Sequence, residues 1–391
     1  MRRWILRRQV PVEEPAPPAG PLVPLLLFAL TAVSMFVTAL AATPVELFPG
    51  ETPGLLDLLA RLYRNDQARA GAFAMAGSLL AILATHEAGH YVAARIHGVP
   101  VGFPHFLPLP FVSPFGTMGA VIRMPYPVRD RRKLFDIGAA GPIAGLTLAI
   151  PLYAYGVSIS VRVPHLEAIG QGVELGSSLL SLGLERVFGP PGGAETDLVL
   201  SPVAFGAWGG LLLTMLNLLP VGQLDGGHVA TALFGNRWAR GAATVHRLMF
   251  LAFLLLAVGP GLLASLRGEG FALVPHAGRA TFWFVWAELV AVIAGVPRAN
   301  GMGPQARILS TLALSWAGSS VVVRTSEGMT ALWLFAVATF VGTDLAQAGF
   351  ADPGLAHPSV EGEGLTRSRQ VIAWCTLVTF VLLLMPWPMA A

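Results

Sequence analysis

The chain has 391 residues, of which 54% are hydrophobic and only 12% are charged, with a net charge of +3. Soluble domains carry about 25% charged residues, so this composition excludes an ordinary soluble enzyme and indicates an integral membrane protein. The sparse charge argues against a nucleic-acid partner, and the single cysteine, Cys375, excludes an internal disulfide.

The first predicted span is Leu22–Ala42, which follows a tail with four arginines and several prolines. About 20 apolar residues cross a bilayer, and this run has that length. It comes too late and is too long for a cleaved signal, so we interpret residues 1–21 as a cytoplasmic N-terminal tail. Residues 22–70 hold this span and a leucine-rich amphipathic helix, Leu55–Tyr63, which we expect at the membrane interface.

The second predicted span, Gly71–Arg95, contains the pattern H-E-x-x-H at residues 86–90. On a helix, His86 and His90 are one turn apart and share a face, a spacing that suits Zn²⁺ with one position left for water. Glu87 lies beside them and can take a proton from that water. Polar groups near the end of a membrane helix are costly unless they act, so we favour a metal site over a simple polar helix end.

The next segment, Val99–Tyr126, is apolar but broken by prolines and glycines. A plain helix cannot hold these prolines, so we expect a re-entrant loop or β-hairpin. Within it, Gly116–Arg123 is expected to form a strand edge to which an extended substrate adds, with a passive Gly-rich turn that only fills space as the alternative. We interpret His97 as a surface or loop residue and His105 as a buried histidine bonded to the backbone, with a plug at the metal as the alternative for His105.

The third predicted span, Phe135–Tyr155, carries glycines at 141 and 145, a spacing that favours close helix packing. A Gly-rich loop, Gly156–Thr196, leads to the fourth span, Leu198–Leu219. Later candidate spans are Met249–Leu266, Thr281–Val296, Ile308–Val323, Met329–Leu345 and Val371–Met385.

The distribution of arginine orients these spans. Basic residues gather before span one, between spans two and three, and after span four, whereas the Gly156–Thr196 loop is mainly acidic. If the four spans alternate in direction, all three basic groups lie on the cytoplasmic face. His86 and His90 then lie within ~15 Å of the cytoplasmic end of their helix.

A third metal ligand is expected at the end of span four, because catalytic zinc usually has three protein ligands. Pro220 and Gly222 interrupt the helix there, and Asp225 follows on the same membrane face as the two histidines. The alternative for Asp225 is a cap for the next helix, a common role of aspartate. We favour the ligand role, and a supporting role for His228 remains open.

These motifs resemble the site-2 protease family of intramembrane zinc metalloproteases, in the branch without a PDZ domain that includes the plant chloroplast EGY proteases and their bacterial relatives. The similarity is carried by H-E-A-G-H, by G-T-M-G-A at residues 116–120, by F-D-I-G-A-A-G-P-I-A-G at residues 135–145, by N-L-L-P-V-G-Q-L-D-G-G-H at residues 217–228, and by His357-Pro358. The resemblance implies one Zn²⁺ per chain bound by His86, His90 and Asp225. It also implies Glu87 as general base and Asn217 as a group that holds the substrate carbonyl or its oxyanion.

The predicted fold is an all-α polytopic membrane protein, a multi-span helical bundle with a Pro/Gly-rich re-entrant loop or β-hairpin. Residues 71–235 would form the catalytic membrane core and residues 236–391 the C-terminal membrane helices. The resemblance implies regulated intramembrane proteolysis, with the lipid bilayer and a transmembrane protein substrate as partners. It favours a bacterial plasma membrane with the active site near the cytoplasmic face, and the oligomeric state stays open.

Two other functions fit part of the sequence. A multi-span transporter or channel would explain the Gly- and Pro-broken segments, but not the convergence of two metal-ligand motifs on one membrane face. A catalytically inactive scaffold of the same fold would not need a general base, so the intact Glu87 argues against it.

Overall fold

The computed structural model describes residues 20–41, 60, 62–110, 113–122, 124, 127–164, 174–193, 195–268, 283–289, 310–311, 313–314, 337, 358–386 and 389–390. Within these residues, four helical segments are long and apolar enough to cross a membrane, and α7 is a shorter apolar helix. The predicted helical polytopic membrane fold is therefore confirmed. The helices are α1 (Leu22–Ala41), α3 (Asp66–Ile96), α4 (Arg131–Ser158), α6 (Leu179–Phe188), α7 (Pro202–Asn217), α8 (Asp225–Phe234), α9 (Trp238–Leu266) and α13 (Arg367–Leu383).

The ends of the long helices follow from their capping residues. Asn65 caps α3 by accepting a hydrogen bond from the backbone of Ala68, so this helix begins five residues before the predicted span. The predicted boundary between residues 70 and 71 therefore falls inside a helix. Asp130 caps α4 in the same way, and the backbone bonds it accepts lower the pKa of its carboxyl.

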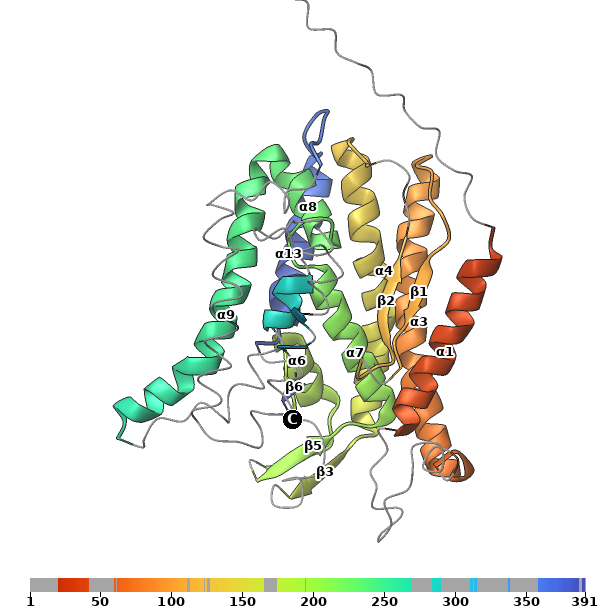
Figure 1. Cartoon of the computed structure of the whole chain (residues 1–391), viewed down its shortest axis with the longest axis vertical. Coiled ribbons are helices and arrows are strands. Elements are labelled where there is room, and N and C mark those ends of the chain that lie inside the picture. The colour runs from red at the N-terminus through yellow and green to blue at the C-terminus, as the bar shows by residue number, and fades with distance from the viewer. Residues whose placement is uncertain are drawn as a thin grey trace, which may run out of the picture.

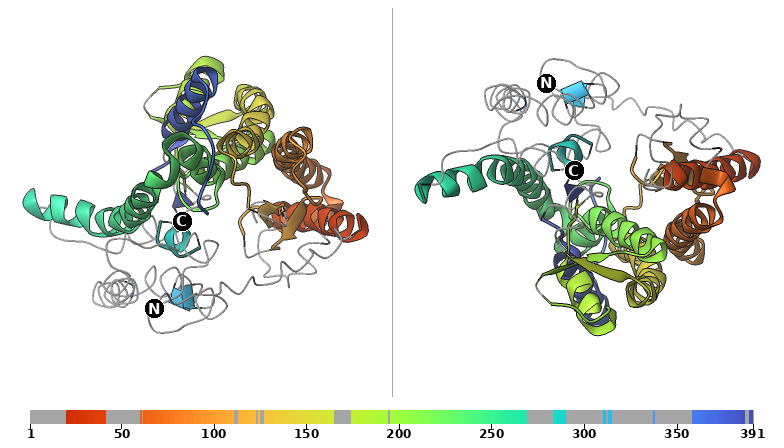
Figure 2. Two further views of the ribbon diagram at one scale, coloured as in Figure 1. Left: turned by 90° about the horizontal axis from the view of Figure 1, so that it is seen from above. Right: turned by 90° about the horizontal axis from the view of Figure 1, so that it is seen from below.

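Helices α3, α4 and α7 pack side by side and form the centre of the bundle (Figure 1). Small residues allow this close approach: a Cβ at Gly206 of α7 would overlap Ser78 and the backbone of Met75 in α3. Side chains of all three helices share one buried apolar cluster. Figure 2 shows α9 extending away from the bundle on the side opposite α1.

The Pro-rich segment after α3 is a β-hairpin, as predicted. Strand β1 (His105–Pro108) pairs antiparallel with β2 (Thr117–Val121), and α1 supports the hairpin. Ser34 of α1 donates a hydrogen bond to the carbonyl of Gly116 at 2.6 Å. Gly116 has φ of 72°, and a Cβ there would come within 2.8 Å of the Met35 backbone, so only glycine fits this turn.

The segment predicted as a Gly-rich loop, Gly156–Thr196, contains more regular structure than expected. It forms β3 (Val161–Pro164), β4 (Glu174–Leu175) and α6, and β3 pairs with β5 (Thr196–Val199). Helix α6 begins with a capping box between Ser178 and Ser181. The loop prediction missed this helix because α6 is only ten residues long.

The last predicted span, Val371–Met385, falls on helix α13, which is not among the described helices that are long and apolar enough to cross a membrane. Its 17 residues correspond to ~25 Å. Arg369 in its first turn contacts Asp136 of α4, and β6 (Met389–Ala390), just after it, pairs with β4. Helix α13 therefore runs from one end of the bundle to the other. The predicted spans at 281–296, 308–323 and 329–345, and the interfacial helix at 55–63, lie largely outside the described residues.

Candidate metal centre

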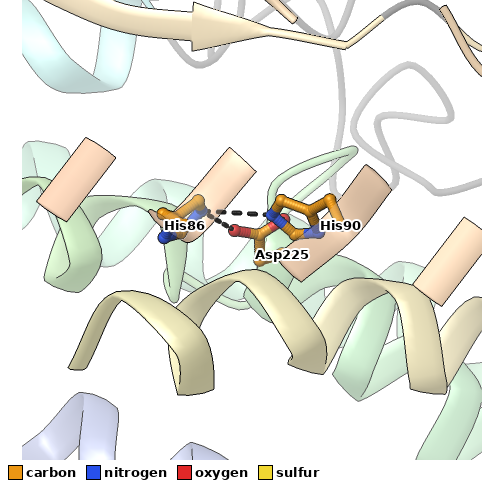
Figure 3. Close-up of side chains that lie close together, drawn as sticks. All are labelled: His86, His90 and Asp225. Atoms are coloured by element: carbon orange, nitrogen blue, oxygen red, sulfur yellow. Dashed lines mark hydrogen bonds and ion pairs between the residues drawn. The ribbon is translucent and has the colours of Figure 1, made fainter. Parts of the chain in front are cut away.

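Helix α3 places His86 and His90 one turn apart on its buried face, against α4 and α8 (Figure 3). Gly141 and Gly145 of α4 form the surface against which the two imidazoles pack, and with Gly138 of the same helix they are here called the glycine wall. A Cβ at Gly141 of α4 would overlap the imidazole of His90, and one at Gly145 would come within 3.2 Å of His86. The two glycines were predicted to serve helix packing, and the structure shows that they also make room for the two imidazoles.

A backbone hydrogen bond fixes the orientation of His90. Its Nδ1 lies 2.8 Å from the carbonyl oxygen of Ile137. A carbonyl oxygen can only accept, so Nδ1 carries the proton and the lone pair of the neutral ring is on Nε2. Nε2 lies 3.1 Å from the Nε2 of His86. The ring therefore presents a metal-binding nitrogen toward the second histidine.

Asp225 reaches the histidines because the chain folds back sharply between α7 and α8. Gly222 in this turn has φ of 55°, a conformation that favours glycine. Gly226 and Gly227 pack directly on the turn's carbonyl oxygens, where any Cβ would overlap Leu218 and Gly222. Trp238 closes the turn by donating its indole N–H to the carbonyl of Pro220.

The carboxylate of Asp225 lies against the imidazoles and not over its own helix. Asp225 is the first residue of α8, and among the described residues no side-chain cap bond forms at that helix's N-terminus. Its Oδ2 lies 3.1 Å from His86 Nε2, and its Oδ1 lies 3.2 Å from His90 Nε2. The geometry thus favours the ligand role over the capping role that the sequence left open.

The spacing of these atoms fits a single divalent ion. Zinc holds nitrogen and oxygen ligands at ~2.0–2.2 Å, so neighbouring corners of a tetrahedron around it lie ~3.3 Å apart. The ligand atoms of His86, His90 and Asp225 all lie within 4.8 Å of one another, and the closest pairs are at 3.1–3.2 Å. Two imidazole nitrogens and a carboxylate are a typical donor set for zinc.

The two remaining predicted site residues are also close. Glu87 is only 6% exposed and interacts electrostatically with His86, His90 and Asp225. Asn217, the last residue of α7, places its side-chain nitrogen 3.4 Å from His86 Nε2. The structure thus brings all five predicted site residues together, from α3, α7 and α8.

Three other histidines for which the sequence predicts a place or a role are His97, His105 and His228. Within the described residues, the group that could hold a metal contains neither His105 nor His228. His228 packs against Gly138 of α4, the third glycine of the same wall. His97, predicted as a surface or loop residue, caps the end of α3 and lies 2.8 Å from the carboxylate of Asp136. Nothing in its local sequence indicated that contact, because the two residues are 39 positions apart.

The described residues combine long apolar helices with an H-E-x-x-H pattern and an aspartate that together could hold a metal ion. Residues 74–258 match the model of peptidase family M50, which supports the resemblance to the site-2 protease family. The match begins within α3 and ends within α9, so it includes every residue of the metal centre.

Several curated relatives are plant proteins. The probable zinc metalloprotease EGY2, chloroplastic, of Oryza sativa subsp. indica is 34% identical over 161 residues, which cover 40% of this chain and 28% of the relative. The Arabidopsis thaliana protein of the same name is 33% identical over 162 residues, with the same coverage. The probable zinc metalloprotease EGY1, chloroplastic, of Oryza sativa subsp. japonica is 30% identical over 246 residues, or 59% of this chain and 41% of the relative. The chain thus spans well under half the length of these relatives, and no solved structure matches it.

Proposed function

We propose that this protein is an intramembrane zinc metalloendopeptidase that cleaves transmembrane segments of other membrane proteins. The observation that carries the proposal is the convergence of three ligand atoms, from His86, His90 and Asp225, beside a buried carboxylate on an apolar helix. The match to peptidase family M50 and the names of the EGY relatives support the same chemistry. We expect one Zn²⁺ per chain.

Each residue of the centre has a distinct role in this proposal. His86, His90 and Asp225 would hold the zinc, which when bound would polarise a carbonyl and lower the pKa of its water to about 7. Glu87 takes a proton from the attacking water and returns it to the leaving amine. The Asn217 amide, adjacent to His86, donates a hydrogen bond to the substrate carbonyl as negative charge develops on its oxygen.

The substrate must be presented as extended chain, because a helix hides its own carbonyls in hydrogen bonds. Strand β2 confirms that the Gly116–Arg123 segment contains a strand, and its use as a docking edge for substrate stays a prediction. Gly119 has φ of 89°, so proline at this position would distort the strand as well as remove a donor. Positions 120 and 121, which also lie in β2, are therefore the better places to test the edge.

The transporter and scaffold alternatives explain less of the structure. A solute path does not need two imidazoles and a carboxylate at tetrahedral spacing, and a scaffold does not need Glu87 buried beside them. The distribution of arginine supports a metal centre toward the cytoplasmic face, and the resemblance to bacterial relatives supports a bacterial plasma membrane. The curated relatives have chloroplastic names, so this compartment stays a prediction.

The test compares membranes that contain the wild type or Glu87→Gln. Glutamine keeps the shape of the side chain but cannot act as the base, so cleavage should fall by about 10²–10⁴-fold while zinc content stays at one per chain. Proteomics would search for fragments cut within transmembrane segments, and elemental analysis would measure zinc. Glu185→Gln on α6 is the matched control, because that carboxylate contacts Tyr153 at the other end of the bundle. Equal amounts of these fragments in wild-type and Glu87→Gln membranes would contradict the proposal. Wild-type protein that holds no zinc would contradict it as well.

A further inference from the structure

The carboxylate of Asp136, in the second turn of α4, joins three helices. Arg369 of α13 donates to both of its oxygens, from Nε at 2.9 Å and from Nη2 at 2.8 Å. His97, the C-cap of α3, lies 2.8 Å from the same carboxylate. All three side chains are partly buried, and two-point arginine–carboxylate pairs are among the stronger ion pairs.

The segment that carries Arg369 also holds α8. Asn236, just after α8, makes two hydrogen bonds with the backbone of Val360, at 2.8 and 3.2 Å. Val360 and Leu365 are buried in a small cluster with Val229 and Ala232 of α8. Helix α13 then packs along α8 and α4. Residues 358–383 therefore form a brace, here called the C-terminal brace, between α4 and α8.

The C-terminal brace bears on the metal centre because the candidate ligands come from two different helices. The two histidines belong to α3, whose end is tied to Asp136 through His97. Asp225 belongs to α8, which is ten residues or ~15 Å long and follows a Gly-rich turn. Asp136 thus links the helix that carries the histidines to the brace that holds the helix carrying the aspartate.

We propose that Asp136 and Arg369 are positioning residues of the metal centre, which set α8 at the angle that brings Asp225 to His86 and His90. This inference rests on the proposed zinc site. The pair acts through the helices and touches neither metal nor substrate. Ligands must be held within about 0.5 Å of the productive geometry, so a small rotation of α8 weakens metal binding.

The test measures zinc affinity, which does not depend on activity. Full-length detergent-purified protein carrying Asp136→Asn, Arg369→Gln or both is titrated with a chelator, and the bound zinc is measured. Loss of groups that orient metal ligands costs about 10–100-fold in affinity, and we expect about tenfold for Arg369→Gln. Asp136→Asn should weaken zinc binding further because it also loses the contact with His97. The double variant should match Asp136→Asn, because both changes break the same Asp136–Arg369 interaction.

The control is the ion pair between Arg132 of α4 and Glu363 of the brace. It joins the same two segments at 2.7 Å, but its side chains are 45% and 87% exposed, so Arg132→Gln and Glu363→Gln should leave zinc affinity unchanged. Arg369→Lys keeps the charge without the two-point geometry and should restore part of the affinity.

The outcomes separate the two proposals. A tenfold loss confined to the Asp136–Arg369 pair, with partial recovery in Arg369→Lys, supports the positioning role. If the variants unfold at lower temperature without metal but bind zinc as tightly as the wild type, the pair is only structural and this inference is overturned. A wild type that binds no zinc under the same conditions contradicts the proposed function itself.

Discussion

Helices α3 and α8 bring ligands to the same centre in different ways. Helix α3 has 31 residues, a side-chain cap at its start, and two ligands one turn apart. Helix α8 has ten residues, starts without a side-chain cap bond among the described residues, and carries its ligand at its first position. The geometry of the first pair is set by the helix itself, whereas the position of Asp225 depends on the turn before α8 and on the contacts at its far end.

This difference separates local from long-range determinants of the site. The spacing of His86 and His90 follows from helix geometry, so changes far along the chain should leave it intact. The distance from Asp225 to those imidazoles depends on α4, the α7–α8 turn and the C-terminal brace. We therefore expect remote substitutions to weaken the α8 side of the centre more than the α3 side.

The largest effect is expected from removing a ligand on either side. His86→Ala and Asp225→Ala should each leave zinc below one per chain and abolish cleavage, because a catalytic zinc site with two protein ligands is incomplete. Zinc content of the purified variants and fragment formation would be measured together. Full zinc and full activity in Asp225→Ala would show that α8 supplies no ligand.

The next largest effect is expected at the glycine wall of α4, which packs against the histidines of α3 and against α8. Gly141→Ala places a methyl group where the His90 imidazole lies, so zinc affinity should fall by about 100-fold, the upper end for groups that orient ligands. Gly77→Ala on α3 is the matched control, since a Cβ there meets nothing within 4 Å and alanine favours the helix. Normal zinc affinity in Gly141→Ala would mean that α4 can move away from the histidines at little cost.

The comparison between α3 and α8 also explains which parts of this site the sequence could predict. The pattern at residues 86–90 predicts two ligands and a base because one helix fixes their geometry. The sequence indicated Asp225 by its place after a broken span, but left a capping role open, and only the folded turn distinguishes the two. Contacts between distant segments had no sequence signal, such as His97 with Asp136 or the glycine wall with the imidazoles. The ten-residue α6 was missed because so short an apolar run does not identify a helix by its periodicity.

The smallest effect is expected at the far end of α8, where Arg131 of α4 donates to the carbonyl oxygens of Ala232 and Leu233, both at 2.9 Å. A cation at a helix C-terminus contributes about 0.3–1 kcal/mol, and up to ~2 kcal/mol when partly buried. With the ordinary range of about 0.3–1 kcal/mol, Arg131→Gln should weaken zinc binding by about 2- to 5-fold, since ~1.4 kcal/mol corresponds to tenfold.

Hydrogen exchange would show whether that loss is confined to α8. In Arg131→Gln, amides of residues 225–234 should exchange faster, while those of α3 around His86 should keep the wild-type rate. Arg132→Gln is the control, because the neighbouring arginine pairs with the exposed Glu363 and does not contact the α8 carbonyls. Faster exchange in both helices would mean that α3 and α8 move as one unit, and the contrast between a locally fixed and a remotely fixed ligand would then be wrong.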